Sequence, residues 1–281
     1  ALRSINPGVQ LFCVGDDWQA INRFAGSDLK FYREFDRIFA PSRRLQLTTN
    51  RRSKRSVVQV SNALMSGRGA PAKPATDEPG TVNVVDLAKF RPTSLEESTF
   101  KRSLLTPVVL RIAGASLAKG HSVVLLSARN VLYDPGGGAV PLDRYLRSLR
   151  ERLPASVRER LSISTAHGFK GNQSDVVIVL DATERNYPLI HPNWIFSRVL
   201  GESESAIVDE FRRLFYVALT RAKTELFLLT EGNRRSPFLD EISSQTSLAD
   251  INWDGFPPVL QDDEWLVVKV LGAYEAIDHW P

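Results

Sequence analysis

The side chains best suited to chemistry in this sequence are arginines close to the ends of predicted helices. Arg51 and Arg52 are adjacent where a helix is about to begin, and Arg221 lies near the end of the block 210–223. A guanidinium group is planar and can donate two parallel hydrogen bonds to one phosphate. A solvated arginine pair and a solvent-facing basic helix face remain the structural alternatives.

Two polar loops next to predicted strands could supply further ligand contacts. Residues 15–17 (Gly-Asp-Asp) end one apolar run and are followed by Gln19. His167 lies between Thr165 and Lys170, in a loop that joins two other apolar runs. Because α/β sheets bind ligands at the carboxyl ends of their strands, polar contacts with a ligand are plausible in both loops. An acidic turn and a packed or solvated histidine are the plainer alternatives.

The two loops lie at the ends of short apolar runs. These runs predict the strands of a parallel sheet. The runs cover residues 10–14, 81–85, 122–126, 161–165, 176–180 and 225–229. Most of them are apolar on both sides of the pleat, which is typical of strands covered on both faces. Helices are predicted at 53–65, within 95–118, at 142–153 and at 209–223. This alternation predicts an α/β fold with helices on both faces of the sheet.

The helix over 209–223 has the clearest pattern. Its apolar positions recur at helical spacing and form one face: Phe211, Leu214, Phe215, Ala218 and Leu219. The acidic residues at its start suit the positive end of the helix dipole. The apolar face does not require the basic and polar residues of the same helix.

The other segments are predicted to be loops or packing elements. Residues 66–80 are rich in Gly, Pro and Ala, and 133–141 contain three consecutive glycines, so a loop and a flexible turn are expected. The tail from residue 236 onward carries tryptophans among acidic residues and prolines, and packing is its expected role. Residues 265–271 could form one further strand.

Composition sets outer limits on function. The 281 residues are 43% hydrophobic and 24% charged, as in ordinary globular proteins. No apolar run approaches the ~18 residues of a membrane-spanning helix, so no membrane partner is expected. The single Cys13 excludes disulfide frameworks and multi-cysteine zinc sites, and it fits a reducing, cytoplasmic location. A net charge of +4 only weakly favours a polyanionic partner.

Four blocks, taken together and in order, resemble motifs III, IV, V and VI of superfamily 1 DNA helicases of the UvrD/Rep family. They read VGDDWQAINRF (14–24), LTTNRRS (47–53), STAHGFKG (164–171) and RRLFYVALTRAK (212–223), and they are most like the helicase IV type. The resemblance spans roughly residues 10–240. It implies a RecA-like parallel α/β fold in which 1–45 end a first domain, 46–240 form the second and 241–281 are an extension.

The resemblance also implies roles for individual residues. Helicases of this family bind ATP with Mg²⁺ between two RecA-like domains. Gln19 would sense the γ-phosphate, Arg52 and Arg221 would contact it, and Gln173 stands where the family often contacts the nucleotide sugar with Glu. Single-stranded DNA would cross both domains, and its candidate contacts here are Phe24, Arg129, Thr165 and His167.

Some family features are changed or absent. Asn22, Ala25 and Arg51 replace residues that are common in the family, and no G-x-x-x-x-G-K-[ST] phosphate loop occurs in the sequence. The chain is therefore read as a C-terminal fragment that needs the N-terminal half of the same protein and does not hydrolyse ATP alone. A non-catalytic RecA-like module that binds DNA or a repair partner is the main alternative, and a purely structural α/β domain is the second.

Overall fold

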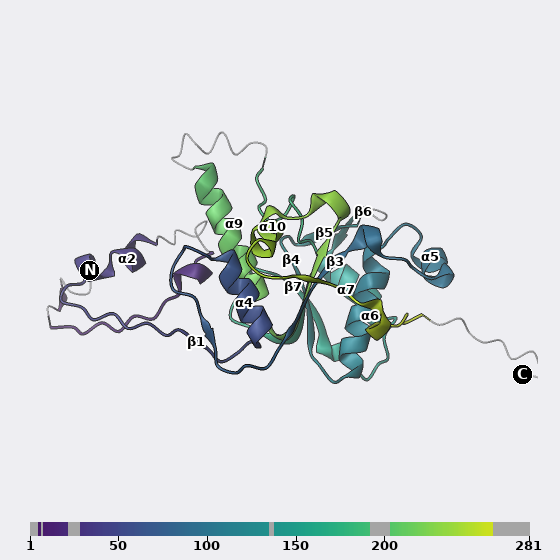
Figure 1. Cartoon of the computed structure of the whole chain (residues 1–281), viewed down its shortest axis with the longest axis horizontal. Coiled ribbons are helices and arrows are strands. Elements are labelled where there is room, and N and C mark those ends of the chain that lie inside the picture. The colour runs from purple at the N-terminus through teal and green to yellow at the C-terminus, as the bar shows by residue number, and fades with distance from the viewer. Residues whose placement is uncertain (1–4, 7, 22–28, 135–137, 192–202, 261–281) are drawn as a thin grey trace, which may run out of the picture.

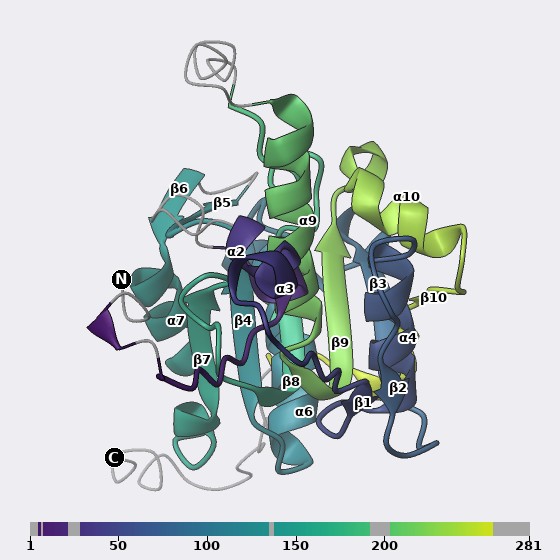
Figure 2. The ribbon, with the colours of Figure 1, turned by 90° about the vertical axis from the view of Figure 1, so that its left-hand side faces the viewer.

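A six-stranded parallel sheet forms the centre of the molecule. The structure is a computed structural model, and it describes residues 5–6, 8–21, 29–134, 138–191 and 203–260. The strand order is β10-β3-β9-β8-β4-β7, and every neighbouring pair is parallel. The strands are β3 (Thr81–Asp86), β4 (Val123–Ser127), β7 (Leu161–Thr165), β8 (Ser174–Val179), β9 (Ala222–Thr230) and β10 (Ala249–Asp250). Figure 2 shows the longer strands side by side behind α9 (Glu204–Leu219).

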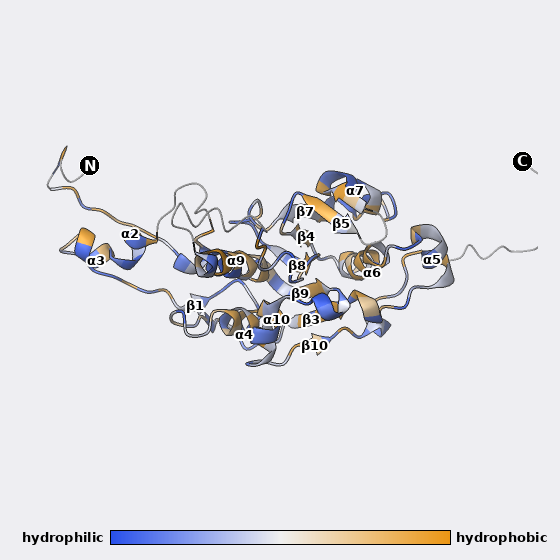
Figure 3. Ribbon diagram, turned by 90° about the horizontal axis from the view of Figure 1, so that it is seen from above, coloured by the Kyte–Doolittle hydropathy of each residue, from blue (hydrophilic) through white to orange (hydrophobic). Residues whose placement is uncertain are grey.

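The strands are apolar because helices cover both faces of the sheet. All five residues of β4 are buried, and so are the last four of β8. One face carries α4 (Arg55–Leu64), α9 and α10 (Pro237–Ser243), whereas the other carries α6 (Leu105–Ala118) and α7 (Leu142–Arg150). Figure 3, seen from above, shows the sheet between these two helical layers. The predicted fold class, a parallel α/β sheet with helices on both faces, is confirmed.

The long helix α9 forms because its start is capped and its apolar face is buried. The Ser203 hydroxyl accepts a hydrogen bond from the Ala206 backbone N–H at 3.2 Å, and Glu204 adds negative charge to the first turn. Leu214, Phe215, Ala218 and Leu219 are at most 1% exposed, as their spacing predicts. The helix therefore packs firmly on the sheet and leads directly into β9.

Short elements complete the described chain. Helical ones are η1 (Asp17–Gln19), α2 (Lys30–Arg33), α3 (Phe35–Ile38), η3 (Leu87–Lys89), α5 (Ser94–Phe100), η4 (Arg158–Arg160), η6 (Gly232–Arg234) and η7 (Trp253–Gly255). Two small sheets pair β1 (Thr49–Asn50) with β2 (Lys73–Pro74) and β5 (Val131–Asp134) with β6 (Gly138–Pro141). Within the described ranges, no helix is both long enough and apolar enough to cross a membrane.

Two expectations about local structure are wrong. Residues 10–14 form no strand, and Phe12 and Val14 are 91% and 83% exposed. An apolar strand needs neighbouring strands for its backbone hydrogen bonds, and among the described residues none lies beside this one. Residues 133–141 were expected to be a flexible turn, but the described residues at both ends of this segment belong to β5 and β6, which pair in antiparallel fashion, and Leu132 of β5 is buried. Residues 135–137 lie outside the described residues. The possible strand at 265–271 lies outside the described residues.

Candidate functional site

The segment 16–21 folds against α9 and the end of α4. The Asp16 carboxylate accepts a hydrogen bond from the Trp18 backbone N–H at 3.0 Å and so starts η1. The Trp18 indole N–H donates to the Arg68 carbonyl at 3.1 Å, and the ring meets Tyr216 edge-on at 5.3 Å between centroids. Ile21 is fully buried. These contacts hold Gln19, the last residue of η1, in one position.

Two further groups bind the backbone that follows Gln19. The Arg213 Nε donates to the Ala20 carbonyl at 2.7 Å. The His167 side chain hydrogen-bonds the Ile21 backbone, and desolvation lowers the pKa of this histidine. His167 therefore contacts the same segment that carries Gln19.

Arg221 lies at the turn between α9 and β9, where backbone and side-chain oxygens surround its guanidinium. Its Nε donates to the Val217 carbonyl at 2.9 Å and its Nη1 to the Asn172 carbonyl at 3.1 Å. Its Nη2 lies 3.1 Å from the Thr220 hydroxyl oxygen and 3.4 Å from the Gln19 side-chain oxygen. The residue is fully buried. The structure thus brings Gln19 and Arg221 together.

Arg52 reaches the same turn from the start of α4. Its Nη1 donates to the Thr220 carbonyl at 3.2 Å, although the residue is largely exposed. The Asn50 side chain accepts hydrogen bonds from the Arg52 and Ser53 backbone N–H groups at 2.9 and 3.0 Å. The Ser53 hydroxyl donates to the Ala222 carbonyl at 2.7 Å, which attaches this loop to the start of β9.

The cluster is positively charged, and the carboxylate of Asp16, which accepts a hydrogen bond from the Gln19 side chain, offsets this charge only in part. Desolvation, followed by the nearby charge of Arg52, lowers the pKa of Arg221 to about 10. Among the described residues, neither arginine forms an ion pair with a carboxylate. Two guanidinium groups that meet only neutral acceptors are suited to an anion such as a phosphate.

Gln173 lies beside this cluster but is not bonded to it through its side chain. It is exposed and directly precedes Ser174, whose backbone N–H donates to the Arg221 carbonyl at 3.0 Å. The cluster is therefore at the amino ends of β8 and β9, not at the carboxyl ends where ligands of α/β sheets usually bind. In the part of the chain that the structure describes, no group of three or more His, Cys, Asp or Glu side chains could hold a metal ion.

A second group of predicted residues lies at the carboxyl ends of β4 and β7. Thr165 ends β7 and pairs with Ser127 of β4, two residues before Arg129. The Thr165 hydroxyl accepts a hydrogen bond from the Gly168 backbone N–H at 3.0 Å. The Arg129 Nη2 donates to the Arg185 carbonyl at 3.1 Å. Thr165 and Arg129 therefore share one edge of the sheet, whereas Phe24 lies outside the described residues.

Asp181 hydrogen-bonds the residues at the end of β4 and so stabilises this edge. The sequence patterns did not single out this residue. Its Oδ2 accepts hydrogen bonds from the Ser127 hydroxyl at 2.9 Å and the Ala128 backbone N–H at 3.1 Å. Desolvation raises the pKa of this carboxyl group to about 6. Its position directly after the apolar run 176–180 could have indicated a polar group at the end of a strand.

The basic residues of α9 do not form a solvated face, so that alternative reading is wrong. Arg212 is 6% exposed, donates to both carboxylate oxygens of Glu241 and lies 4.7 Å from the centre of the Phe238 ring. Arg213 binds Ala20, as described above, and Tyr216 is 8% exposed. The helix thus uses its polar residues for tertiary contacts with α10 and with the segment 16–21.

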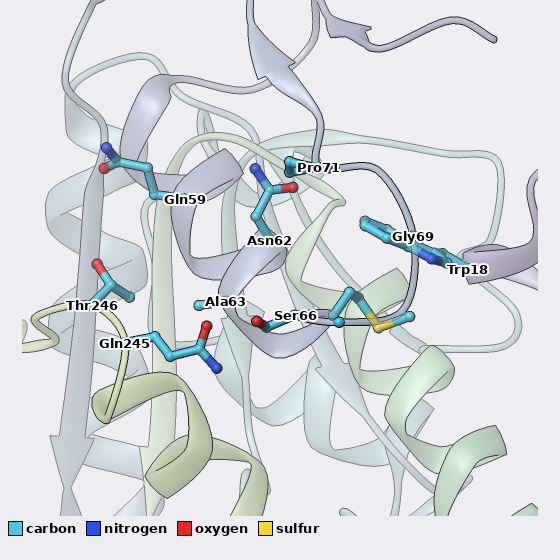
Figure 4. A pocket seen from close by; sticks show the side chains of 11 residues that line it. Trp18, Gln59, Asn62, Ala63, Ser66, Gly69, Pro71, Gln245 and Thr246 are labelled. Carbon is cyan, nitrogen blue, oxygen red and sulfur yellow. The ribbon is translucent and has the colours of Figure 1, made fainter.

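A cavity of about 430 Å³ lies on the side of Trp18 toward α4. Figure 4 shows side chains from α4, the following loop and the segment after α10 around it. None of the described residues that line it is charged, and its polar side chains include Gln59, Asn62, Ser66, Gln245 and Thr246. Because it has no cationic group, this cavity is poorly suited to phosphate, unlike the Arg52 and Arg221 cluster.

Comparisons with known proteins agree with the family resemblance. Residues 145–232 match the model of the UvrD-like helicase C-terminal domain. DNA helicase IV of Escherichia coli (strain K12) is 30% identical over 244 residues, which cover 85% of this chain and 32% of that protein. A probable DNA helicase of Mycoplasma pneumoniae is 26% identical over 78% of this chain and 38% of that protein.

Two other similarities are more limited. A probable DNA helicase II homolog of Mycoplasma pneumoniae is 36% identical over 85 residues, which cover 30% of this chain and 11% of that protein. The C-terminal domain of a possible DNA helicase from Lactobacillus plantarum WCFS1 overlaps with a TM-score of 0.40 at 15% identity, over 69% of this chain and 94% of that one. The chain spans between a tenth and two fifths of the length of the curated relatives it matches.

Proposed function

Because the chain belongs to the UvrD/Rep family of superfamily 1 DNA helicases, we propose that it is the C-terminal part of a longer enzyme. That enzyme would couple ATP hydrolysis to movement along single-stranded DNA and to duplex unwinding. In this proposal residues 1–45 end a first RecA-like domain, 46–240 form the second and 241–281 are an extension. The extension contributes to the second domain's packing, because Ile242 and Phe256 are buried with its helices and strands.

The observation that carries the proposal is the cluster of Gln19, Arg52 and Arg221. Their side chains come from three separate parts of the chain and meet at one turn, with Arg221 in hydrogen-bond range of Gln19. Neutral oxygens fix the orientation of the Arg221 guanidinium before any ligand arrives, and such preorganised donors stabilise charge that develops on a bound phosphate. A fully buried arginine without an ion pair is unusual, because buried charges are generally paired.

Each residue of the cluster then has a role in phosphoryl transfer. ATP with Mg²⁺ would supply the phosphoryl group and its metal. Arg221 and Arg52 would donate to the γ-phosphate oxygens and offset negative charge, and Gln19 would contact the same group. Gln173, at the start of β8, would contact the nucleotide sugar.

Single-stranded DNA would bind at the other edge of the sheet, where β4 and β7 have their carboxyl ends. Thr165 and Arg129 would contact backbone phosphates, which positions a strand without reading its sequence. His167 would also contact the DNA strand; it lies two residues after Thr165 and hydrogen-bonds the Ile21 backbone close to Gln19. Phe24 would stack on a base.

The test is DNA-stimulated ATP turnover by the whole protein that carries this chain. We expect Arg221→Ala to lower turnover by about 10³ or more, because a γ-phosphate arginine contributes about 10³ to 10⁵ in rate. Arg221→Lys should recover only part of this loss, because an ammonium group lacks the planar fork. The exposed Arg91, whose side chain only binds neighbouring carbonyls, is the matched control as Arg91→Ala and should leave turnover unchanged.

Equal turnover by wild type and Arg221→Ala would contradict the catalytic role. In that case the non-catalytic DNA- or partner-binding module would be the better description. The affinity for single-stranded DNA should change little in the Arg221 variants, since the arginine lies at the amino ends of the strands and the proposed DNA contacts at the carboxyl ends. A parallel loss of DNA binding would indicate a folding defect instead.

A further inference from the structure

The β5–β6 pair presents an exposed tyrosine at the carboxyl edge of the sheet. Tyr133 is 61% exposed, whereas Leu132 beside it in β5 is 3% exposed and Val140 of β6 packs against the same core. Because successive strand residues point to opposite faces, Leu132 packs into the core and Tyr133 points outward. The exposure of the Tyr133 ring therefore follows from the alternation of side chains along β5.

The two faces of the Tyr133 ring have different surroundings. The Arg129 guanidinium lies 5.7 Å from the ring centre. The residue opposite Tyr133 in β6 is Ala139, whose methyl group is too small to cover the ring. An aromatic ring that is 61% exposed and has a cation over one face can accept a planar partner.

The neighbourhood of the ring suits a nucleic-acid strand. Arg129 lies two residues after Ser127, which pairs directly with Thr165, so the ring adjoins the proposed phosphate contacts. Helix α7 begins next to this pair, since the Leu142 backbone N–H donates to the Asn130 carbonyl at 3.2 Å. The nearest acidic side chain on that helix is Asp143 in its first turn, and it is followed by the exposed Arg144 and Arg147.

We propose that Tyr133 is a base-stacking residue for single-stranded DNA, in a site completed by Arg129 and Thr165. This inference rests on the proposed DNA-dependent function. The occupant is a single strand, because the face of a base is available to a ring only when the base is not stacked within a duplex. The phosphates on either side of that base would meet Arg129 and Thr165. Stacking of this kind does not depend on base identity.

The experiment measures binding of a fluorescent single strand of about 15 nucleotides to the whole protein by anisotropy. Tyr133→Ala should weaken binding of an oligo-dT strand by about five- to 150-fold, and Tyr133→Phe should restore it. With an abasic strand of equal length, wild type and Tyr133→Ala should bind equally, because the phosphates remain and the stacked base is gone. Thr165→Ala should weaken binding of both strands.

Tyr32 provides the matched control. It is also an exposed tyrosine, 40% accessible, with the Arg44 guanidinium 5.8 Å from its ring centre. Figures 1 and 3 show its helix, α2, on the far side of the molecule from β5 and β6. Tyr32→Ala should leave DNA binding unchanged.

The outcomes separate this inference from the proposed function. If wild type binds oligo-dT and Thr165→Ala weakens it, while Tyr133→Ala has no effect, the stacking role is wrong and the DNA function stands. If wild type binds neither strand, both are wrong. A loss in Tyr133→Ala that is equal for oligo-dT and abasic strands would also overturn stacking, since it would show a backbone contact or a misfolded edge.

Discussion

Arg111 and Arg221 are both buried, on opposite faces of the sheet, and their surroundings differ. Arg111 of α6 donates to the two carboxylate oxygens of Glu96 at 2.8 and 2.5 Å and lies 5.0 Å from the centre of the Phe90 ring. Arg221 is less exposed still, 0% against 8%, but its hydrogen-bond partners are neutral oxygens.

Burial of a charge costs free energy, and a counter-ion offsets that cost only where the geometry is good. The Arg111–Glu96 pair meets this condition and connects α5 to α6. Although desolvation opposes the charged form of Glu96, hydrogen bonds from Arg111 and Thr93 hold its pKa below the usual range. Arg221 forms no ion pair among the described residues, and the charge of Asp16 acts on it without a direct contact. This difference in pairing is what the proposed phosphate-binding role of Arg221 would explain.

The largest effect is expected for Arg221→Met, a substitution that should lower ATP turnover without a large loss of stability. In Arg221→Met the buried charge is replaced by an apolar group of similar length, so the free energy of unfolding should fall by less than about 1 kcal/mol or should rise. ATP turnover by the whole protein should nevertheless fall by about 10³ or more. Urea unfolding and a turnover assay on the same preparation would measure both. A destabilisation as large as that of a Glu96 variant would make Arg221 a structural residue.

Glu96→Gln should show the opposite pattern. It leaves the buried Arg111 cation without a counter-ion, so the free energy of unfolding should fall by roughly 3 kcal/mol or more. ATP turnover at a temperature where the variant is folded should not change. Glu97, exposed in the same turn of α5, is the matched control, and Glu97→Gln should be nearly neutral. Equal free energies of unfolding for Glu96→Gln and Glu97→Gln would show that the buried Arg111–Glu96 pair contributes no more to stability than an exposed glutamate does.

Asp181, two residues after β8, is a second buried charged group that forms no ion pair within the described ranges, although the charge of Arg129 acts on it. Because desolvation raises its pKa from 3.8 to about 6, the folded state binds its proton more tightly than the unfolded state does. Stability should therefore fall as pH rises from about 4 to about 6, by on the order of 1–3 kcal/mol. In Asp181→Asn this part of the pH dependence should disappear from the unfolding curves. An unchanged pH profile would mean that this carboxyl group is well hydrated.

The smallest expected effect comes from Asp175, at the other end of β8. Desolvation opposes its charged form, but hydrogen bonds from Ser122 and the charge of Lys223 lower its pKa from 3.8 to about 2. Its contribution to stability is therefore present above about pH 4 and lost as pH falls toward 2, by about 1–2 kcal/mol at most because the side chain is partly exposed. Acid unfolding of Asp175→Asn should lack this part of the slope. A steeper slope in that variant would contradict the pairing.

The sequence alone was sufficient for the fold class and for the helix that precedes β9. Apolar runs such as 176–180 and the spacing of Leu214, Phe215 and Ala218 report burial locally, because side-chain direction alternates in strands and repeats every 3.6 residues in helices. The order of four polar blocks also indicated the family, and the comparisons agree. The catalytic and DNA-binding roles assigned to single residues stay predictions.

Only the tertiary structure decided which of these residues meet. Gln19 and Arg221 are 202 positions apart, and no local pattern reports that their side chains lie 3.4 Å from each other. The same limit explains the error at residues 10–14, whose apolar run predicts a strand although a strand forms only where another one can accept its hydrogen bonds. It also explains why Asp181 and Tyr133 were missed, since burial of one and exposure of the other depend on neighbours that are remote in sequence.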